Sequence, residues 1–92
     1  MKNKELKRII NDASELFHSG NFSKSKVLCH QALKLDSGNT KILHLLSILS
    51  LQTREINEAL AFAQKAIKNK PKDLGINNSL ALSYRAKGEL NK

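Results

Sequence analysis

The sequence predicts an all-α protein in which five helices stack as antiparallel hairpins. Residues of similar type recur 34 positions apart, as the small residues Ala13, Ser47 and Ala81 show. A fixed period between about 20 and 50 residues is typical of stacked repeats rather than of a single closed domain. The chain has only one proline and four glycines among 92 residues, which also favours helix.

The first two helices are expected over residues 3–19 and 22–35, where apolar side chains recur at helical spacing. Gly20 ends the first helix, because glycine readily adopts the left-handed conformation that closes a helix. Asn21 is then placed to cap the second helix. Residues 36–39, Asp-Ser-Gly-Asn, form a turn between this hairpin and the next.

The third helix, expected over residues 40–53, is apolar around much of its circumference, which is typical of a helix with neighbours on several sides. The fourth helix is expected over residues 56–68, and Pro71 prevents its continuation. Asp73 can cap a fifth helix over residues 74–87. Helices and short turns alternate without a linker, so successive helices pair as hairpins.

The net charge of +8, from 16 basic and 8 acidic residues, raises the question of nucleic-acid binding. Thirteen of the 16 basic residues are Lys, and most fall on the outer faces and loops of the predicted helices. No aromatic residues are interleaved among them to stack on bases. We interpret the charge as a solvated lysine-rich surface, and nucleic-acid binding is the less favoured alternative.

A single cysteine, Cys29, excludes an internal disulfide framework, and we expect it to be a buried thiol. Residues 1–4 lead into an amphipathic segment and not into the apolar core of a signal peptide. The longest apolar-rich stretch, residues 42–51, is too short to span a membrane. These features predict a cytoplasmic protein that does not bind membranes.

The period, and the residues at fixed places within it, resemble the tetratricopeptide repeat (TPR) family, whose unit is a pair of helices. The first unit, residues 6–39, matches the family pattern at Ile9, Ala13, Leu16, Gly20, Phe22, Ser25 and Ala32. The second unit, residues 40–73, matches at Leu43, Leu46, Ser47, Ile56, Ala59, Ala66 and Pro71. A partial third unit, residues 74–92, matches at Leu80, Ala81, Tyr84, Gly88 and Leu90. The resemblance implies one domain over residues 1–92 with a right-handed α-solenoid fold.

Two departures from the family pattern bear on the second unit. Arg54 stands where the family has glycine. An arginine in the left-handed conformation would cost about 1 kcal/mol, so the geometry of this turn is left open. Ser50 stands where the family usually has a large residue.

Residues 88–90, Gly-Glu-Leu, read as the start of a further turn and helix. The fifth helix would then carry an apolar flank, with Ile76, Leu80 and Tyr84 as candidates for a homodimer contact. Repeat stacks usually end in a helix with a polar outer face. Three explanations are open: the chain is a fragment of a longer repeat protein, the flank pairs with a second copy, or its exposure is tolerated.

In TPR proteins the first helices of successive units line a concave groove that holds an extended or helical peptide. Carried over by position, the first unit contributes Lys7, Ile10, Ser14, Phe17 and His18. The second unit contributes Lys41, His44, Ile48, Leu51 and Gln52, and the third contributes Asn78, Leu82 and Arg85. The resemblance therefore implies a partner-binding module whose protein or peptide partner has apolar anchors and some acidic character. The alternative for Ile10, Phe17 and Ile48 is that they only complete the packing between helices.

The sequence shows no pattern for catalysis, a cofactor or a metal. It contains no glycine-rich phosphate loop, paired carboxylates or Ser/His/Asp arrangement. His18 and His44 are offset by about 12 Å along neighbouring helices, at about 1.5 Å per residue, which is too far for two ligands of one zinc ion. One TPR subset clamps a C-terminal carboxylate with Lys and Asn, but the corresponding positions here lack a cation or amide: Ile10, Ser14, Leu45, Gly75 and Ser79. We therefore expect a non-enzymatic scaffold or adaptor that needs no cofactor.

Overall fold

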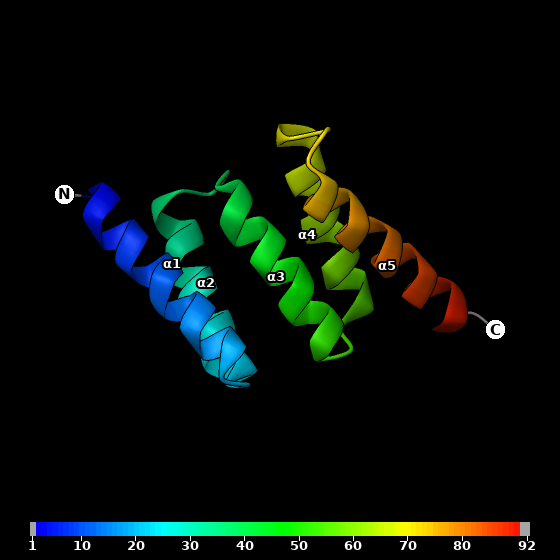
Figure 1. The fold of residues 1–92 in the computed structure, drawn as a ribbon, viewed down its shortest axis with the longest axis horizontal. Coiled ribbons are helices and arrows are strands. Elements are labelled where there is room, and N and C mark those ends of the chain that lie inside the picture. Colours follow the sequence, from blue (N-terminus) through cyan, green and yellow to red (C-terminus); the bar gives the residue numbers. More distant parts are fainter. Residues whose placement is uncertain (1, 91–92) are drawn as a thin grey trace.

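The computed structural model describes residues 2–90 and contains, over that range, five α-helices (Figure 1). Their bounds are α1 Lys2–His18, α2 Phe22–Leu35, α3 Thr40–Gln52, α4 Ile56–Asn69 and α5 Leu74–Leu90. The all-α prediction is confirmed, and the first four helices begin and end within one residue of the expected positions. None of the described helices is both long enough and apolar enough to cross a membrane.

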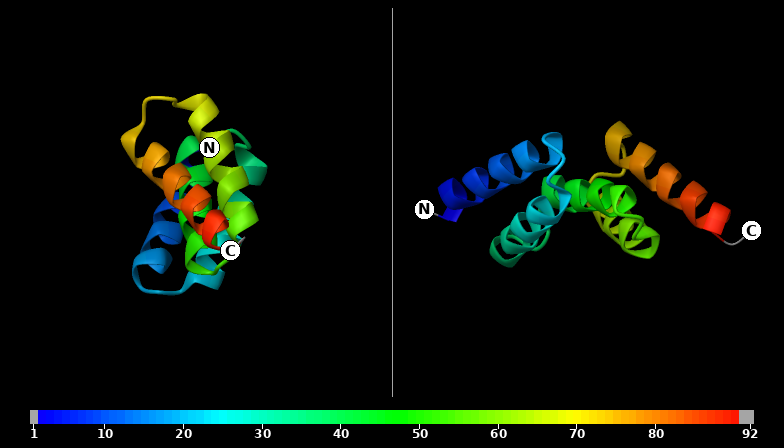
Figure 2. Two further views of the ribbon diagram at one scale, coloured as in Figure 1. Left: turned by 90° about the vertical axis from the view of Figure 1, so that its right-hand side faces the viewer. Right: turned by 90° about the horizontal axis from the view of Figure 1, so that it is seen from below.

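The helices form two layers, with α1, α3 and α5 on one side and α2 and α4 on the other (Figure 2). α1 pairs with α2, α3 pairs with α4, and α5 packs against both α4 and α3. The molecule is elongated in the direction of stacking and measures 47 × 28 × 19 Å. This arrangement is the predicted succession of antiparallel hairpins.

α3 lies at the centre of the stack and contacts every other helix. One core cluster joins side chains of α1 and α2 to three residues of α3, Ile42, Leu46 and Leu49. A second cluster joins Leu43 of α3 to Ala66 of α4 and Ile76 of α5. The apolar circumference of this segment therefore has packing partners on both sides, as its sequence indicated.

Small residues lie where the two helices of each hairpin cross. In the first hairpin the Ser25 hydroxyl donates to the Ala13 carbonyl oxygen at 2.7 Å. In the second hairpin the Ser47 hydroxyl donates to the Ala59 carbonyl oxygen at 2.9 Å. All four residues are fully buried, so the helices approach closely. Ala81, at the equivalent place in α5, is exposed because no second helix covers it within residues 2–90.

Two turns between paired helices share one backbone geometry. Gly20 has φ of 87° and Arg54 has φ of 64°, so both residues are left-handed. Asn21 and Glu55 each donate their N–H to the carbonyl oxygen five residues earlier, at 2.8 Å. This is the pattern that closes a helix with a left-handed residue. The turn at Arg54 therefore has the same backbone geometry as the turn at Gly20.

Side chains cap the helix start at two of the four positions where a polar residue precedes the helix, and Glu55 before α4 forms no such cap. The Asp73 carboxylate accepts the Ile76 N–H at 2.9 Å, as predicted for the start of α5. The Asn39 side chain accepts the Ile42 N–H at 3.0 Å at the start of α3. Asn21 precedes α2 but forms no side-chain cap. Its amide instead donates to the Ser19 hydroxyl at 3.1 Å.

α5 does not end where the sequence predicted. Gly88 lies inside the helix, which continues to Leu90, so residues 88–90 do not form a turn. A glycine inside a helix costs only about 1 kcal/mol relative to alanine. No following helix in the described residues packs back over α5 to favour a turn instead. Residues 91–92 of the third repeat lie outside the described part of the chain.

The flank of α5 also differs from the prediction. Ile76 is 1% exposed because it faces α3 and α4, so it is not available for a homodimer contact. Leu80 is half-buried, and Tyr84 is 52% exposed. Five of the exposed residues of α5 follow one line along the helix, which we call the outer stripe: Leu74, Asn77, Ala81, Tyr84 and Gly88.

Candidate functional site

The layer of α1, α3 and α5 carries all of the thirteen predicted groove residues, and none of them is buried. Seven are exposed: Lys7, His18, Lys41, Gln52, Asn78, Leu82 and Arg85. Six are half-buried: Ile10, Ser14, Phe17, His44, Ile48 and Leu51. Seven of the thirteen gather in two hollows of this layer, one at the start of α3 and one at its end.

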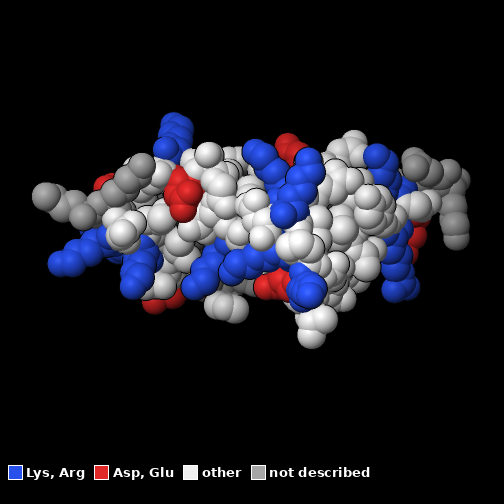
Figure 3. All heavy atoms as spheres, turned by 90° about the horizontal axis from the view of Figure 1, so that it is seen from above, with Lys and Arg blue, Asp and Glu red and all other residues white. Residues whose placement is uncertain are grey.

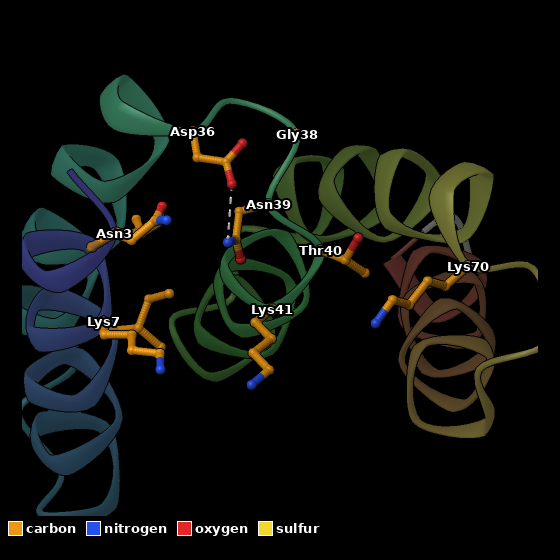
Figure 4. Close-up of a pocket in the computed structure, with 10 residues that line it drawn as sticks. Asn3, Lys7, Asp36, Gly38, Asn39, Thr40, Lys41 and Lys70 are labelled. Carbon is orange, nitrogen blue, oxygen red and sulfur yellow. Dashed lines mark hydrogen bonds between the residues drawn. The ribbon is translucent and has the colours of Figure 1, made fainter. Parts of the chain in front are cut away.

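The first hollow, which we call the basic hollow, has a volume of about 610 Å³. It lies between the beginnings of α1 and α3 and the end of α4 (Figure 4). Three predicted groove residues line it, together with seven that the sequence analysis did not assign to the groove. The full lining is Asn3, Leu6, Lys7, Ile10, Asp36, Gly38, Asn39, Thr40, Lys41 and Lys70.

Backbone geometry brings the lysines of the basic hollow together. Lys7 comes from α1, Lys41 from the first turn of α3, and Lys70 from the residue that ends α4 (Figure 4). The Asn69 amide donates to the Gly38 carbonyl oxygen at 3.0 Å, and this bond ties the end of α4 to the loop before α3. Lys70 therefore joins a hollow to which no local sequence pattern assigns it.

The basic hollow is positively charged. Its one acidic residue, Asp36, accepts a hydrogen bond from the Asn39 amide at 3.3 Å. Within residues 2–90, none of the three lysines takes part in an ion pair. Figure 3 views the end of the molecule where α1, α3 and α5 begin, and basic side chains outnumber acidic ones on it.

The second hollow, which we call the apolar hollow, lies between the C-terminal halves of α3 and α5 and has a volume of about 320 Å³. Four predicted groove residues line it: Leu51, Gln52, Leu82 and Arg85. The remaining two are Ala86 and Glu89. Leu82 is 45% exposed, so part of its apolar side chain is open to contact at this hollow.

The charges at the apolar hollow are paired with each other. Nε of Arg85 lies 3.6 Å from the Glu89 carboxylate, one helical turn away, and both side chains are largely exposed. Such a pair contributes little to stability. The pair does neutralise the charges at the apolar hollow, whereas the basic hollow keeps a net positive charge.

His44 holds α5 against α3. Its Nε2 lies 2.9 Å from the Ser79 hydroxyl, and its ring packs against Gly75. A Cβ at position 75 would lie 3.2 Å from Cε1 of His44, so a side chain there would push the ring away. His44 lines neither hollow and lies along α3 between Lys41 of the first and Gln52 of the second.

The aromatic residues at the end of α1 also have a packing role. The ring centroids of Phe17 and Phe22 lie 5.7 Å apart, and the His18 ring meets Phe17 edge-on at 5.4 Å. Phe17 and Ile10 both pack against the first core cluster while staying half-exposed. Their positions therefore fit packing between helices as well as contact with a partner. Among the described residues, no three His, Cys, Asp or Glu side chains gather as a metal site.

Cys29 is a fully buried free thiol, as the sequence predicted. Burial raises the pKa of this thiol to about 11, against a smaller opposing effect of a hydrogen bond with Ser25. The thiol is therefore protonated at neutral pH, whereas a reactive cysteine needs the thiolate.

One ion-pair network was not predicted from the sequence. Lys26 of α2 reaches the turn between α3 and α4, where it pairs with Glu55 and lies 3.9 Å from Glu58. The Thr53 hydroxyl also donates to Glu55, at 2.7 Å. The hydrogen bond from Lys26 lowers the pKa of Glu55. Lys26 and Glu55 are 29 residues apart, so no local pattern could reveal the pair.

Two layers of sequential helical hairpins define an α-helical repeat protein. The profile of the tetratricopeptide repeat family matches residues 16–82, which is more than half of the chain, and the chain belongs to this family. Membership implies an α-solenoid. Tetratricopeptide repeats are generally modules for protein–protein interaction, which agrees with a surface that carries two open hollows.

Two curated proteins match most of this chain. The UDP-N-acetylglucosamine–peptide N-acetylglucosaminyltransferase of Caenorhabditis elegans is 28% identical over 85 residues, which are 92% of this chain and 7% of that protein. The rhomboid protease GluP of Bacillus subtilis (strain 168) is 29% identical over 79 residues, which are 86% of this chain and 16% of that protein. The chain thus spans only a small part of either relative's length.

Proposed function

We propose that residues 1–92 form one interaction module that binds a peptide segment of a partner protein across the layer of α1, α3 and α5. The observation that carries this proposal is the gathering of seven predicted groove residues in two hollows of that layer. Apolar side chains of the partner are buried against Leu51, Leu82 and the half-exposed Ile48. Burial of apolar surface favours the complex, against the freedom that both partners lose on association.

Charged residues orient the partner on this surface. Lys7 and Lys41 lie at the basic hollow, and Arg85 lies at the apolar hollow. Complementary charge mainly sets the register and the association rate of a complex, while buried apolar contacts supply most of its affinity. The module itself performs no chemical step in this proposal.

The test is a selection of peptides from a random phage-displayed library on the immobilised chain. Selected peptides are then titrated against the wild type and against the double variant Leu51→Ser/Leu82→Ser. We expect the double variant to lose at least about tenfold in affinity, since each leucine contributes about 1.5–3 kcal/mol when fully buried. Far-ultraviolet circular dichroism should show unchanged helix content, because both side chains are partly or largely exposed.

Leu74→Ser is the matched control, because Leu74 is 86% exposed and lies on the outer stripe, away from both hollows. It should leave peptide affinity unchanged. Equal binding of the selected peptides to the wild type and the double variant would place the binding site elsewhere. A selection that enriches no peptide would argue against peptide binding as the function.

Self-association through the outer stripe is the second candidate function. Leu74 and Tyr84 are exposed by 86% and 52%, and Ala81, which lies between them on the outer stripe, is exposed as well. Ala13 and Ser47, at the places equivalent to Ala81, are covered by α2 and α4. A second copy of the chain could cover the same surface of α5.

A further inference from the structure

We propose that the bound segment is extended and carries two determinants at a fixed spacing: a pair of acidic side chains for the basic hollow, and one large apolar side chain for the apolar hollow about five residues away. This inference rests on the proposed function, because it requires that a partner segment lies across the layer of α1, α3 and α5. It adds which kind of partner side chain binds at each hollow, and how many residues separate the two kinds in the bound segment.

The charge of the basic hollow indicates a pair of acidic groups. Lys7, Lys41 and Lys70 bring three ammonium groups to it, and Asp36 brings one carboxylate. The difference, three minus one, leaves two positive charges without compensation. These lysines come from three different elements, so an acidic partner contacting all of them would tie α1, α3 and α4 together (Figure 4).

The apolar hollow offers a different chemistry. Leu51, Leu82 and Ala86 line it, and Arg85 and Glu89 neutralise each other at its side. An acidic side chain gains nothing from this pair, while an apolar side chain gains contact with two leucines. The two hollows therefore select for different side chains.

The spacing follows from α3, which contributes to both hollows. Lys41 lines the first and Gln52 lines the second, and their separation of eleven positions corresponds to about three full turns of the helix. Both side chains thus lie on the same face, about 16 Å apart along the helix axis. An extended chain advances about 3.3 Å per residue, so about five residues cover this distance. A helical segment of the same reach would need about eleven residues.

Between Lys41 and Gln52, His44 and Ile48 lie at helical spacing on the same side of α3. His44 is held by the Ser79 hydroxyl, and Ile48 is half-buried one turn further on. Neither residue carries a charged carboxylate that would repel an acidic segment. An extended segment that runs from one hollow to the other therefore meets His44 and Ile48 and no acidic side chain of this face of α3.

The experiment uses fluorescent peptides with a Glu-Glu pair and one Leu in a Gly/Ser background. The Leu follows or precedes the pair by two, five, eight or eleven residues, and binding to the whole 92-residue chain is measured by fluorescence anisotropy. The peptides with a spacing of five, in one of the two orders, should bind at least about tenfold more tightly than peptides with only Glu-Glu or only Leu. An optimum at eleven would overturn the extended conformation.

Variants assign each determinant to its hollow. Lys41→Ala/Lys70→Ala should weaken binding of the optimal peptide by roughly tenfold at low salt and leave the Leu-only peptide unaffected. Leu82→Ser should weaken the optimal peptide and leave the Glu-Glu-only peptide unaffected. Lys65→Ala is the control, because Lys65 is an exposed lysine of α4 that lines neither hollow.

Failure of this inference can be told apart from failure of the proposed function. If library-selected peptides depend on Leu51 and Leu82 but lack an acidic pair at this spacing, the two-determinant arrangement is wrong and the peptide-binding function stands. If a short oligothymidylate competes as well as the optimal peptide, and the leucine adds nothing, the basic hollow serves a polyanion instead. If no peptide responds to any variant of either hollow, both proposals fail.

Discussion

At the scale of single residues, the Ser50 hydroxyl is buried without a hydrogen-bond partner among the described residues. An unsatisfied buried hydroxyl costs about 1–3 kcal/mol. Ser50→Ala removes that hydroxyl at little cost in packing, so we expect the free energy of unfolding to rise by about 1 kcal/mol. Urea denaturation followed by circular dichroism measures the change.

The comparison for this prediction is Ser47→Ala, on the same helix and equally buried. The Ser47 hydroxyl donates to the Ala59 carbonyl oxygen at 2.9 Å, so its removal breaks a bond between α3 and α4. We expect Ser47→Ala to lower the free energy of unfolding by about 1 kcal/mol. Destabilisation of the same size by both substitutions would mean that the Ser50 hydroxyl has a partner.

Arg54 is the second residue whose effect on the free energy of unfolding can be measured. Its φ of 64° is left-handed, and a residue with a Cβ pays about 1–2 kcal/mol in that region. Its side chain is exposed, so little packing is lost on its removal. Arg54→Gly should therefore stabilise the protein by about 1 kcal/mol in thermal or urea denaturation. Gly20→Ala, at the equivalent turn, should destabilise it by a similar amount, and no effect of either change would argue that the turns are not left-handed.

At the scale of helices, the pair of Lys26 and Glu55 joins α2 to the turn that begins α4. The hydrogen bond from Lys26 holds the pKa of Glu55 below its ordinary value of 4.5. The unfolded chain therefore binds a proton at a higher pH than the folded chain does. The stability from this pair is fully present above pH 4.5 and is lost as the pH falls through the lower pKa of the folded state.

The measurement is the free energy of unfolding of the wild type and of Glu55→Gln between pH 7 and pH 2.5. The difference between the two proteins should be largest near neutral pH and should shrink as the pH falls below about 4.5. The Glu58→Gln variant is the control, since Lys26 lies 3.9 Å from Glu58 and closer to Glu55. A difference that stays constant across the whole range would mean that the charge of Glu55 plays no part.

At the scale of helices, some features could be predicted from the sequence and others could not. The 34-residue period and the apolar pattern placed the first four helices within one residue, because both depend on local spacing. The same period wrongly predicted a turn at Gly88, because a repeated residue type does not by itself end a helix, and within residues 2–90 no further helix packs over α5. The sequence analysis missed Lys70 as a member of the basic hollow and Lys26 as a member of the ion-pair network. Their partners lie far away in sequence and come close only when the helices stack.

At the scale of the whole molecule, the outer stripe limits how strongly two copies can associate. A stable dimer buries about 800 Å² on each partner. The outer stripe lies on one helix, and only Leu74 and Tyr84 on it are large apolar side chains with high exposure. Tyr84 is also held toward α4, because the Gln64 amide donates to its hydroxyl at 3.0 Å. These features indicate a weak contact rather than a permanent dimer.

We therefore expect light scattering on a size-exclusion column to show a monomer at micromolar concentrations and a dimer only near millimolar concentrations. Leu74→Lys/Tyr84→Glu should remove the dimer, because it places charges on the outer stripe and leaves Ile76 and the core untouched. Leu51→Ser/Leu82→Ser should leave the dimer unchanged, since these residues line the apolar hollow. A micromolar dimer that is lost on changing the outer stripe would make self-association the primary role of the module. A dimer lost only on changing Leu51 and Leu82 would mean that two copies occupy the peptide-binding layer of each other.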